Sequence, residues 1–171
     1  MKSQGLVVSV KSIAAYLIFF RDAYLLLAVD RCGILGKKLL ESNENIYFGD
    51  VGLRNLIAGG ERQGDIEKIL ENIVYQQLVR MGYAVSVGQL RAGEVDFVCT
   101  KSNERLYVQV AYLIASEETE EREFGSLDNI KDNYPKYVIS MTPLVRRSDR
   151  QGVVHLGLRE FLKNGFEKKL P

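Results

Sequence analysis

Two neighbouring segments of the sequence, 93–98 and 107–112, constrain the fold most strongly because both have the composition of β-strands. β-branched and aromatic residues dominate both segments, and the polar residues between them predict a turn. Strand alternation places Asp96 on the face opposite Phe97, near the middle of its strand. Gln109 holds a comparable position on the second strand. An acidic residue inside a strand, beside a polar residue on the next one, is not what packing of a hydrophobic core requires.

The same alternation assigns the remaining residues of both strands to faces. One face of the first strand is expected to carry Val95, Phe97 and Cys99, and the other Glu94, Asp96 and Val98. On the second strand, one face is expected to carry Leu106, Val108, Val110 and Tyr112, and the other Tyr107, Gln109 and Ala111.

Composition is that of an ordinary globular protein. The chain has 171 residues, of which 46% are hydrophobic and 26% charged, enough for one domain with a core, or for one domain and a fragment. The net charge is +1, yet residues 61–130 carry seven basic and thirteen acidic groups, whereas residues 131–171 carry nine and four. The basic last section suits phosphate contact, although such charge more often forms a solvated surface.

Neither the cysteines nor the hydropathy indicate a secreted or membrane protein. Cys32 and Cys99 form no disulfide framework and no metal-ligand spacing, which fits a reducing, cytoplasmic location. The first residues lack the long apolar run of a secretory signal. The apolar run 13–29 is interrupted by Arg21 and Asp22, so each half is too short to cross a bilayer. We expect a buried helix and a buried strand there, and no membrane partner.

The first 58 residues predict two helices and two short strands. A helix capped by Ser9 or Ser12 comes first, strands follow at 24–29 and 45–48, and Asp50 caps the second helix. The first helix carries an apolar stripe that we expect to be core rather than a recognition surface: Val10, Ile13, Ala14, Leu17 and Phe20. This succession is typical of the back of a winged-helix unit, and alone it would bury too little surface to be stable.

Glycines at 59, 60 and 64 mark the most plausible boundary, which divides the chain into residues 1–58 and residues 59–171. The second region predicts, in order, a helix at 65–81, a strand at 83–87, the two strands already described, a helix opened by Ser116, strands at 136–141 and 152–156, and a helix at 158–162. Glu71 borders the apolar stripe of the first of these helices.

A helix, three strands, a helix and a strand form the core succession of the PD-(D/E)XK restriction-endonuclease-like fold, which the second region resembles. The resemblance implies an α/β fold class: a restriction-endonuclease-like mixed sheet flanked by helices, preceded by the remnant of a winged helix. In that fold an Asp on the second strand, and a Glu two residues before a Lys on the third, bind Mg²⁺. A Glu on the first helix often joins them. The metal activates a water and stabilises charge on the scissile phosphate.

A series of short phrases makes the resemblance more specific. They comprise residues 45–54, 71–74, 93–97, 109–110 and 135–139, and the Thr-x-x-Arg-Glu spacing of Thr119, Arg122 and Glu123. Over residues 11–162 the chain is similar to the C-terminal domain of unknown function of bacterial and archaeal AAA-type ATPases. In that family a P-loop ATPase comes first, a winged helix second and a nuclease-like domain last. The sequence contains no Gly-x-x-x-x-Gly-Lys-Ser/Thr motif, so the resemblance implies a truncated form with no ATP site.

Carried over residue by residue, the resemblance implies a degenerate Mg²⁺ site at Glu71, Asp96 and Gln109. Gln109 stands where the family has a carboxylate, and Ala111 where it has the lysine. Losing a positioned proton-handling group costs about a hundred- to ten-thousandfold in rate. Three cations elsewhere are candidates to replace the lysine: Lys101, Arg122 and Lys131.

Each candidate also has a purely structural interpretation. An ionised Asp96 inside a strand needs a cationic partner, and a pair with Arg122 would make the site a relic. Glu94 is expected to be a surface carboxylate, Gln109 a hydrogen-bonded fold element, and His155 an ordinary strand residue. A solvated loop and nonspecific contact with DNA phosphates are the two interpretations of one arginine cluster: Arg146, Arg147 and Arg150.

Three functions remain open from the sequence. The first is a non-catalytic nuclease-like module that binds nucleic acid or a partner protein, the ATPase region included. The second is a weak Mg²⁺-dependent nuclease that uses Glu71, Asp96 and Gln109. The third is a pure protein-interaction domain. The two missing charges at the site disfavour the second, and analogy at the level of the fold places the first slightly ahead of the third.

Overall fold

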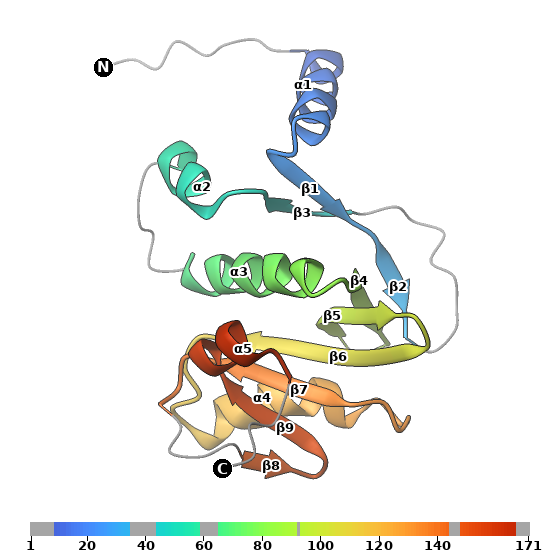
Figure 1. Ribbon diagram of the computed structural model, residues 1–171, viewed down its shortest axis with the longest axis vertical. Coiled ribbons are helices and arrows are strands. Elements are labelled where there is room, and N and C mark those ends of the chain that lie inside the picture. The colour runs from blue at the N-terminus through green and yellow to red at the C-terminus, as the bar shows by residue number, and fades with distance from the viewer. Residues whose placement is uncertain (1–8, 35–43, 59–64, 92, 144–147, 167–171) are drawn as a thin grey trace.

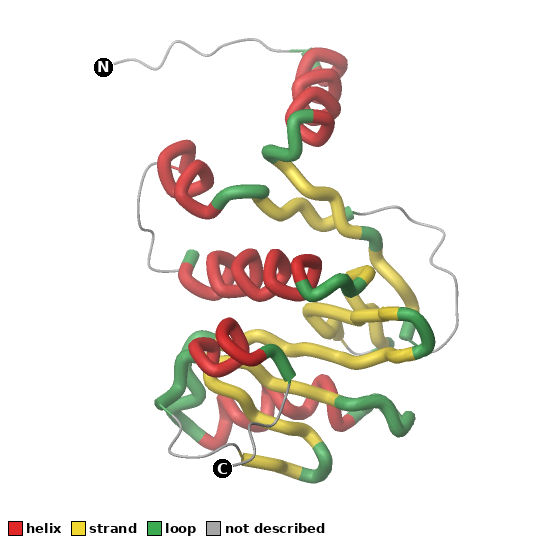
Figure 2. The backbone as a smooth tube through the Cα atoms, viewed as in Figure 1, coloured by secondary structure: helices red, strands yellow, loops and turns green. Residues whose placement is uncertain are grey.

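The computed structural model describes residues 9–34, 44–58, 65–91, 93–143 and 148–166. The helices are α1 (Val10–Asp22), α2 (Val51–Ala58), α3 (Ile66–Arg80), α4 (Glu117–Asp128) and α5 (Leu158–Asn164). The strands are β1 (Leu26–Val29), β2 (Arg31–Gly33), β3 (Asn45–Phe48), β4 (Ala84–Leu90), β5 (Gly93–Lys101), β6 (Glu104–Ala111), β7 (Lys136–Ser140), β8 (Ser148–Arg150) and β9 (Val153–Gly157). Figures 1 and 2 show how these elements are arranged.

Seven strands form one mixed sheet in the order β2-β4-β5-β6-β7-β9-β8, and β1 and β3 form a separate antiparallel pair. Within the large sheet, β2 runs parallel to β4, and β7 runs parallel to both β6 and β9, whereas the remaining pairs are antiparallel. The expected α/β class, with a mixed sheet flanked by helices, is therefore confirmed. The strand β8 occupies residues 148–150, where a loop was expected.

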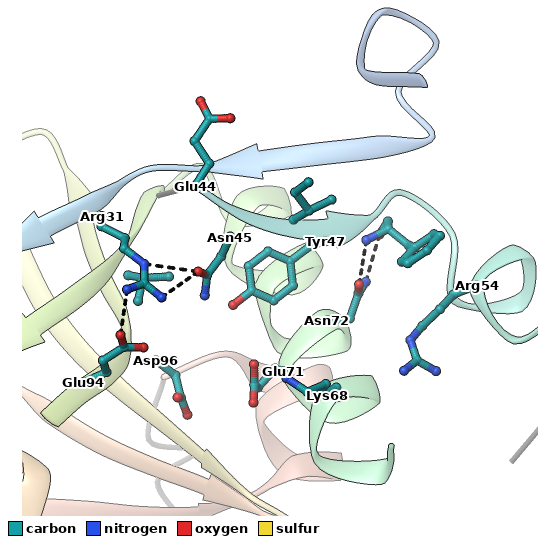
Figure 3. A pocket seen from close by; sticks show the side chains of 13 residues that line it. Arg31, Glu44, Asn45, Tyr47, Arg54, Lys68, Glu71, Asn72, Glu94 and Asp96 are labelled. Carbon is teal, nitrogen blue, oxygen red and sulfur yellow. Dashed lines mark hydrogen bonds and ion pairs between the residues drawn. The ribbon is translucent and has the colours of Figure 1, made fainter. Parts of the chain in front are cut away.

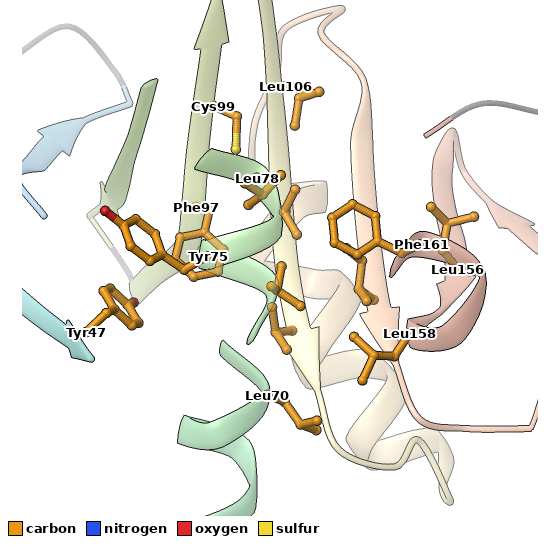
Figure 4. Close-up of a cluster of buried hydrophobic side chains, with 14 of the residues drawn as sticks. Tyr47, Leu70, Tyr75, Leu78, Phe97, Cys99, Leu106, Leu156, Leu158 and Phe161 are labelled. Carbon is orange, nitrogen blue, oxygen red and sulfur yellow. The ribbon is translucent and has the colours of Figure 1, made fainter. Parts of the chain in front are cut away.

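The helix α3 covers one face of the sheet because its apolar residues recur at helical spacing. Leu70, Val74 and Leu78 are buried against the sheet residues Phe97 and Val108. The helix α5 packs on the same face, and Figure 4 shows its Phe161 and Leu158 beside the α3 side chains. Together they form the larger of the two hydrophobic clusters.

The helix α4 covers the opposite face. Ser116 caps it as expected, since its hydroxyl accepts a hydrogen bond from the Thr119 amide at 3.2 Å. The predicted buried side of this segment is confirmed, because Phe124, Leu127 and Ile130 are all buried. They pack with Val95, Val98 and other sheet residues in the second cluster.

Hydrogen bonds and a ring contact attach the β1–β3 pair to α3. The buried side-chain amide of Asn72 makes two of these bonds. Asn72 accepts a hydrogen bond from the Phe48 amide at 2.7 Å and donates one to the Phe48 carbonyl at 2.8 Å. Gln76 donates a further bond to the same carbonyl. Beside them, the rings of Tyr47 and Tyr75 are stacked with centroids 4.7 Å apart. A single turn of α3 thus holds the strand β3 through backbone and ring contacts.

The expectation that the apolar stripe of α1 is core is wrong for the described chain. Ser9 caps the helix as expected, but none of the residues of α1 is buried. Val10 is 83% exposed and Ile13 is 49% exposed. Figure 1 shows the helix standing apart from the sheet, beyond β1. Among the described residues, no helix is long and apolar enough to span a membrane.

His155 lies in β9, as expected, and is buried together with Ser140 of β7. The Ser140 Oγ and His155 Nε2 atoms are 2.8 Å apart. The Thr142 amide donates to the same hydroxyl at 3.1 Å, so that the hydroxyl is free to donate its own proton to a neutral imidazole. Phe124 packs edge-on against the imidazole. The pair is enclosed and serves packing rather than chemistry at the surface.

Burial lowers the pKa of His155 below its usual 6.5, although Glu120 opposes the shift. The neutral ring therefore supports folding fully above that value, and the support is lost as the pH falls towards the lower pKa of the folded protein. We expect His155→Gln, which keeps a side-chain amide for Ser140, to lose less stability than the parent between pH 7 and about pH 5. Urea unfolding of both proteins across this range measures the difference. Parallel pH curves would contradict the assignment.

Candidate functional site

An irregularity in the β4–β5 pairing determines where Asp96 points. Gly88 of β4 pairs with Val95, and Ser86 pairs with Val98, so β5 has one residue more than β4 between these pairs. Such a bulge rotates side chains out of strict alternation. Val95 consequently joins the α4-side cluster while Phe97 stays in the α3-side cluster. The expectation that Val95 and Phe97 share a face is therefore wrong.

Asp96 lies where β5 and β6 separate. The register between the two strands runs from Lys101↔Glu104 to Phe97↔Val108 and includes no pair for Asp96. Side-chain bonds take the place of the ladder there: the Val110 amide donates to Asp96 Oδ2 at 2.7 Å. The Asp96 amide in turn donates to Gln109 Oε1 at 3.4 Å. The strand fork thus holds Asp96 by its backbone and its carboxylate.

Glu71 and Asp96 face the same pocket, of about 540 Å³, between α3 and the β1–β3 pair. Figure 3 shows both residues at this pocket, below the Tyr47 ring in this view. Glu71 reaches it from the first half of α3, and Asp96 from the fork of the sheet. The structure therefore brings together two of the three site residues expected from the sequence.

Gln109 is turned towards α4 instead. Its Nε2 donates to Glu123 Oε2 at 3.4 Å, and its Oε1 accepts from the Ser126 hydroxyl at 3.4 Å. The buried Glu123 is also paired with Arg122, at 2.8 Å. Gln109 is the hydrogen-bonded element that one interpretation expected, and it connects Asp96 to Glu123.

The pocket also contains cations, and two of them are engaged by other groups at its border. The Arg31 guanidinium pairs with Glu94 at 2.8 Å and donates two bonds to Asn45 Oδ1, at 3.3 and 3.1 Å. Arg54 pairs with Asp65 at 3.4 Å. The third cation, Lys68, stands one turn before Glu71 on α3. Glu94 is thus the exposed, paired carboxylate that was expected.

Burial and neighbouring carboxylates raise the pKa values of both Glu71 and Asp96. Burial acts first on Asp96, Glu71 adds to it, and the Val110 amide opposes them, which together raise the pKa of Asp96 to about 8. Burial likewise raises the pKa of Glu71, with Lys68 opposing. Glu123 contributes to both shifts, so it belongs to the same electrostatic group. Neither Glu71 nor Asp96 forms an ion pair among the described residues, and the raised pKa means that the Asp96 carboxyl is mostly protonated at neutral pH.

None of the three proposed replacements for the missing lysine lies at the pocket. Lys101 donates to the Met81 carbonyl, and Lys131 donates to the Asp128 carbonyl. Arg122 pairs with Glu123, so the expected alternative of an Asp96–Arg122 pair is not what the structure shows. Ala111, at the position of the lysine, is buried in β6.

The arginine cluster at 146–150 is only partly described. Arg146 and Arg147 lie outside the described residues. Arg150 donates to Glu120 at 3.1 Å and to Glu121 at 2.6 Å. Its guanidinium is therefore occupied by carboxylates of α4 rather than presented to phosphates.

The donors of the pocket do not form a three-ligand metal centre. Throughout the described ranges, no three His, Cys, Asp or Glu side chains lie close enough together to hold a metal ion. Gln109, the expected third ligand, has its amide directed at Glu123 and Ser126. The described residues therefore bring two carboxylates to the pocket but not the three-ligand set that the resemblance implies.

Several pocket residues escaped the sequence analysis. Glu123, which the sequence analysis noted only in the Thr-x-x-Arg-Glu spacing, does not line the pocket; its burial had a detectable signal, because it lies one helical turn before Leu127 on α4. Arg31 and Lys68 had none, since only the packing of β3 on α3 brings them to the pocket. Tyr47 was within a noted phrase, but its ring contacts required the fold.

Comparison with known proteins adds one relative. The chain is 39% identical over 140 residues to an uncharacterized protein of Haemophilus influenzae. The match covers 82% of this chain but 34% of the relative, so the chain spans about a third of the relative's length. No family profile matches the sequence. No solved structure matches it either.

Proposed function

We propose that this chain is a nuclease-like module of the PD-(D/E)XK type that no longer cuts and that binds a partner protein. The observation that carries the proposal is the direction of Gln109, whose amide meets Glu123 and Ser126 instead of completing a metal site with Glu71 and Asp96. Position 111, where the family has a lysine, is an alanine, and this also disfavours cleavage. Without a metal and a cation, phosphate cleavage loses its main sources of charge stabilisation.

The order of elements supports the nuclease ancestry. A helix, three strands, a helix and a strand follow one another as α3, β4, β5, β6, α4 and β7. Glu71 and Asp96, the two acids that such a site would use, face one pocket where β5 and β6 separate. We further propose that the module belongs to an AAA-type ATPase and that the first 58 residues derive from its winged helix.

Surface chemistry favours a protein partner over nucleic acid. Four carboxyl groups and three cations line the pocket, which gives it no net attraction for phosphates, and Arg150 is already paired with two glutamates. Large apolar side chains of α1 and α2 are exposed, among them Phe19, Leu56 and Ile57. Exposed apolar surface of this kind typically marks a protein contact. The partner is a separate protein or the ATPase region that the resemblance places ahead of this domain.

We expect the purified chain to leave supercoiled plasmid intact in Mg²⁺ or Mn²⁺, because a missing proton-handling group alone costs about a hundredfold or more in rate. Asp96→Ala is the control: cutting that persists in this variant comes from a contaminant. A DNA gel-shift across a salt series completes the test, and we expect no complex even at low salt, where phosphate contacts are strongest. Salt-sensitive binding would establish the nucleic-acid function instead.

A weak Mg²⁺-dependent nuclease is the second candidate. The observation in its favour is that Glu71 and Asp96 face one pocket, which is the arrangement from which a metal site is built. Cleavage that requires metal and disappears in Asp96→Ala would establish this function and overturn the first proposal.

A further inference from the structure

We propose that the pocket between α3 and the β1–β3 pair receives an arginine side chain of the partner protein, whose guanidinium binds the carboxylates of Glu71 and Asp96. The inference rests on the proposed protein-binding function and names the chemical group that is recognised. An organic cation takes the place that a metal ion would hold in a nuclease.

The first reason is that neither carboxyl group forms an ion pair with a cation of the described residues. Asp96 is mostly buried, and the Val110 amide reaches only one of its oxygens. Glu71 faces the same space, with Lys68 on the preceding turn of the helix. Buried carboxylates without a cation are costly, so an incoming positive charge gains what the chain itself does not supply.

The second reason is that the border of the pocket already binds a guanidinium. Arg31 lies there with an ion pair to Glu94 and two hydrogen bonds to the side-chain Oδ1 of Asn45. Figure 3 shows this arginine, Glu71 and Asp96 around the same pocket, with Asn45 and Tyr47 beside them. A planar group with five donors suits oxygens placed around a pocket. The carboxyl oxygens of Glu71 and Asp96 offer a second binding position for a guanidinium in the same pocket.

The third reason is the shape and the lining of the pocket. A volume of about 540 Å³ is ample for an arginine side chain. The Tyr47 ring, supported by its stack on Tyr75, borders the space and gives the guanidinium a flat neighbour. A divalent ion would instead need several oxygens close together, and the described residues provide no group of three acidic or other ligating side chains.

The test uses N-acetyl-arginine amide as the probe and N-acetyl-citrulline amide, which has the same shape without the charge, as its control. The probe is titrated into the ¹⁵N-labelled chain, and the backbone amide resonances of Val110 and Tyr47 are followed. We expect the arginine derivative to shift them with at least about tenfold higher affinity than the citrulline derivative, as charge-assisted bonds require. The double variant Glu71→Gln/Asp96→Asn should lose this preference. Glu104→Gln, which removes one carboxylate at the far end of β6, should keep it.

Equal responses to the two derivatives, or a preference that survives the double variant, would overturn the inference. A response of the same resonances to Mg²⁺ but not to the arginine derivative would also overturn it, in favour of a metal. These failures are separate from failure of the proposed function, which falls only if plasmid is cut or DNA is bound. The citrulline comparison is made on the unaltered protein, so it holds whether or not the double variant folds.

Discussion

Asp96→Asn should stabilise the folded protein at alkaline pH by about 3 kcal/mol, because the substitution removes a buried charge and keeps an acceptor for the Val110 amide. The sign of this stability change follows from the pKa of Asp96, which folding raises from 3.8 to about 8. The carboxyl group costs no stability below the lower value, since it is protonated in both states. The cost grows as the pH rises from 3.8 towards 8 and is constant above that.

The measurement is chemical unfolding of both proteins at several pH values. The difference in free energy of unfolding should be near zero at pH 4 and largest at pH 8 and above. Glu94→Gln is the matched control, because it removes a neighbouring carboxylate that is exposed and paired with Arg31. We expect no gain in stability from it. A variant at position 96 that is less stable than the parent at alkaline pH would mean that the charge is balanced in the native protein.

Asn72→Leu should lower the free energy of unfolding by about 2 kcal/mol, which corresponds to about 4–8 °C in melting temperature for a chain of this size. The two side chains are similar in volume, so the cost comes from the Phe48 amide, which loses its acceptor. The Phe48 carbonyl keeps the bond from Gln76. Because the lost bond fastens β3 to α3, we expect the β1–β3 pair to open first.

Hydrogen exchange separates this local effect from a general loss of stability. Amides of β1 and β3 should exchange faster in Asn72→Leu, while those of β5 and β6 keep their protection. Asn129→Leu provides the control, because Asn129 is exposed and bonds only within its own helix end. A uniform rise in exchange across the large sheet would contradict a local role for Asn72.

The fold could be predicted well because local signals agree with tertiary packing in most elements. The α3 helix was expected at 65–81 and extends over Ile66–Arg80, since its apolar spacing is regular. Ser116 and Asp50 cap helices as expected, the latter by accepting from the Leu53 amide at 2.6 Å. The α1 helix was also placed correctly, but its burial was not, because hydrophobicity does not say whether a partner surface lies within the chain.

The site could be predicted only in part. Glu71 and Asp96 were identified, yet strict alternation misassigned Val95, because a bulge leaves no mark in a run of β-formers. The direction of Gln109 depends on Glu123, which comes from a different element packed against the sheet. Such pairings between distant segments are decided by tertiary contacts and not by the residues on either side.

The short strand β2 ties the first part of the chain to the second. It forms one border of the large sheet by running alongside β4, with Arg31 opposite Val87 and Gly33 opposite Gln89. Without these three residues the backbone of β4 would become an open template for other extended chains. The segment ahead of residue 59 therefore also shields the sheet from self-association, whatever its evolutionary origin.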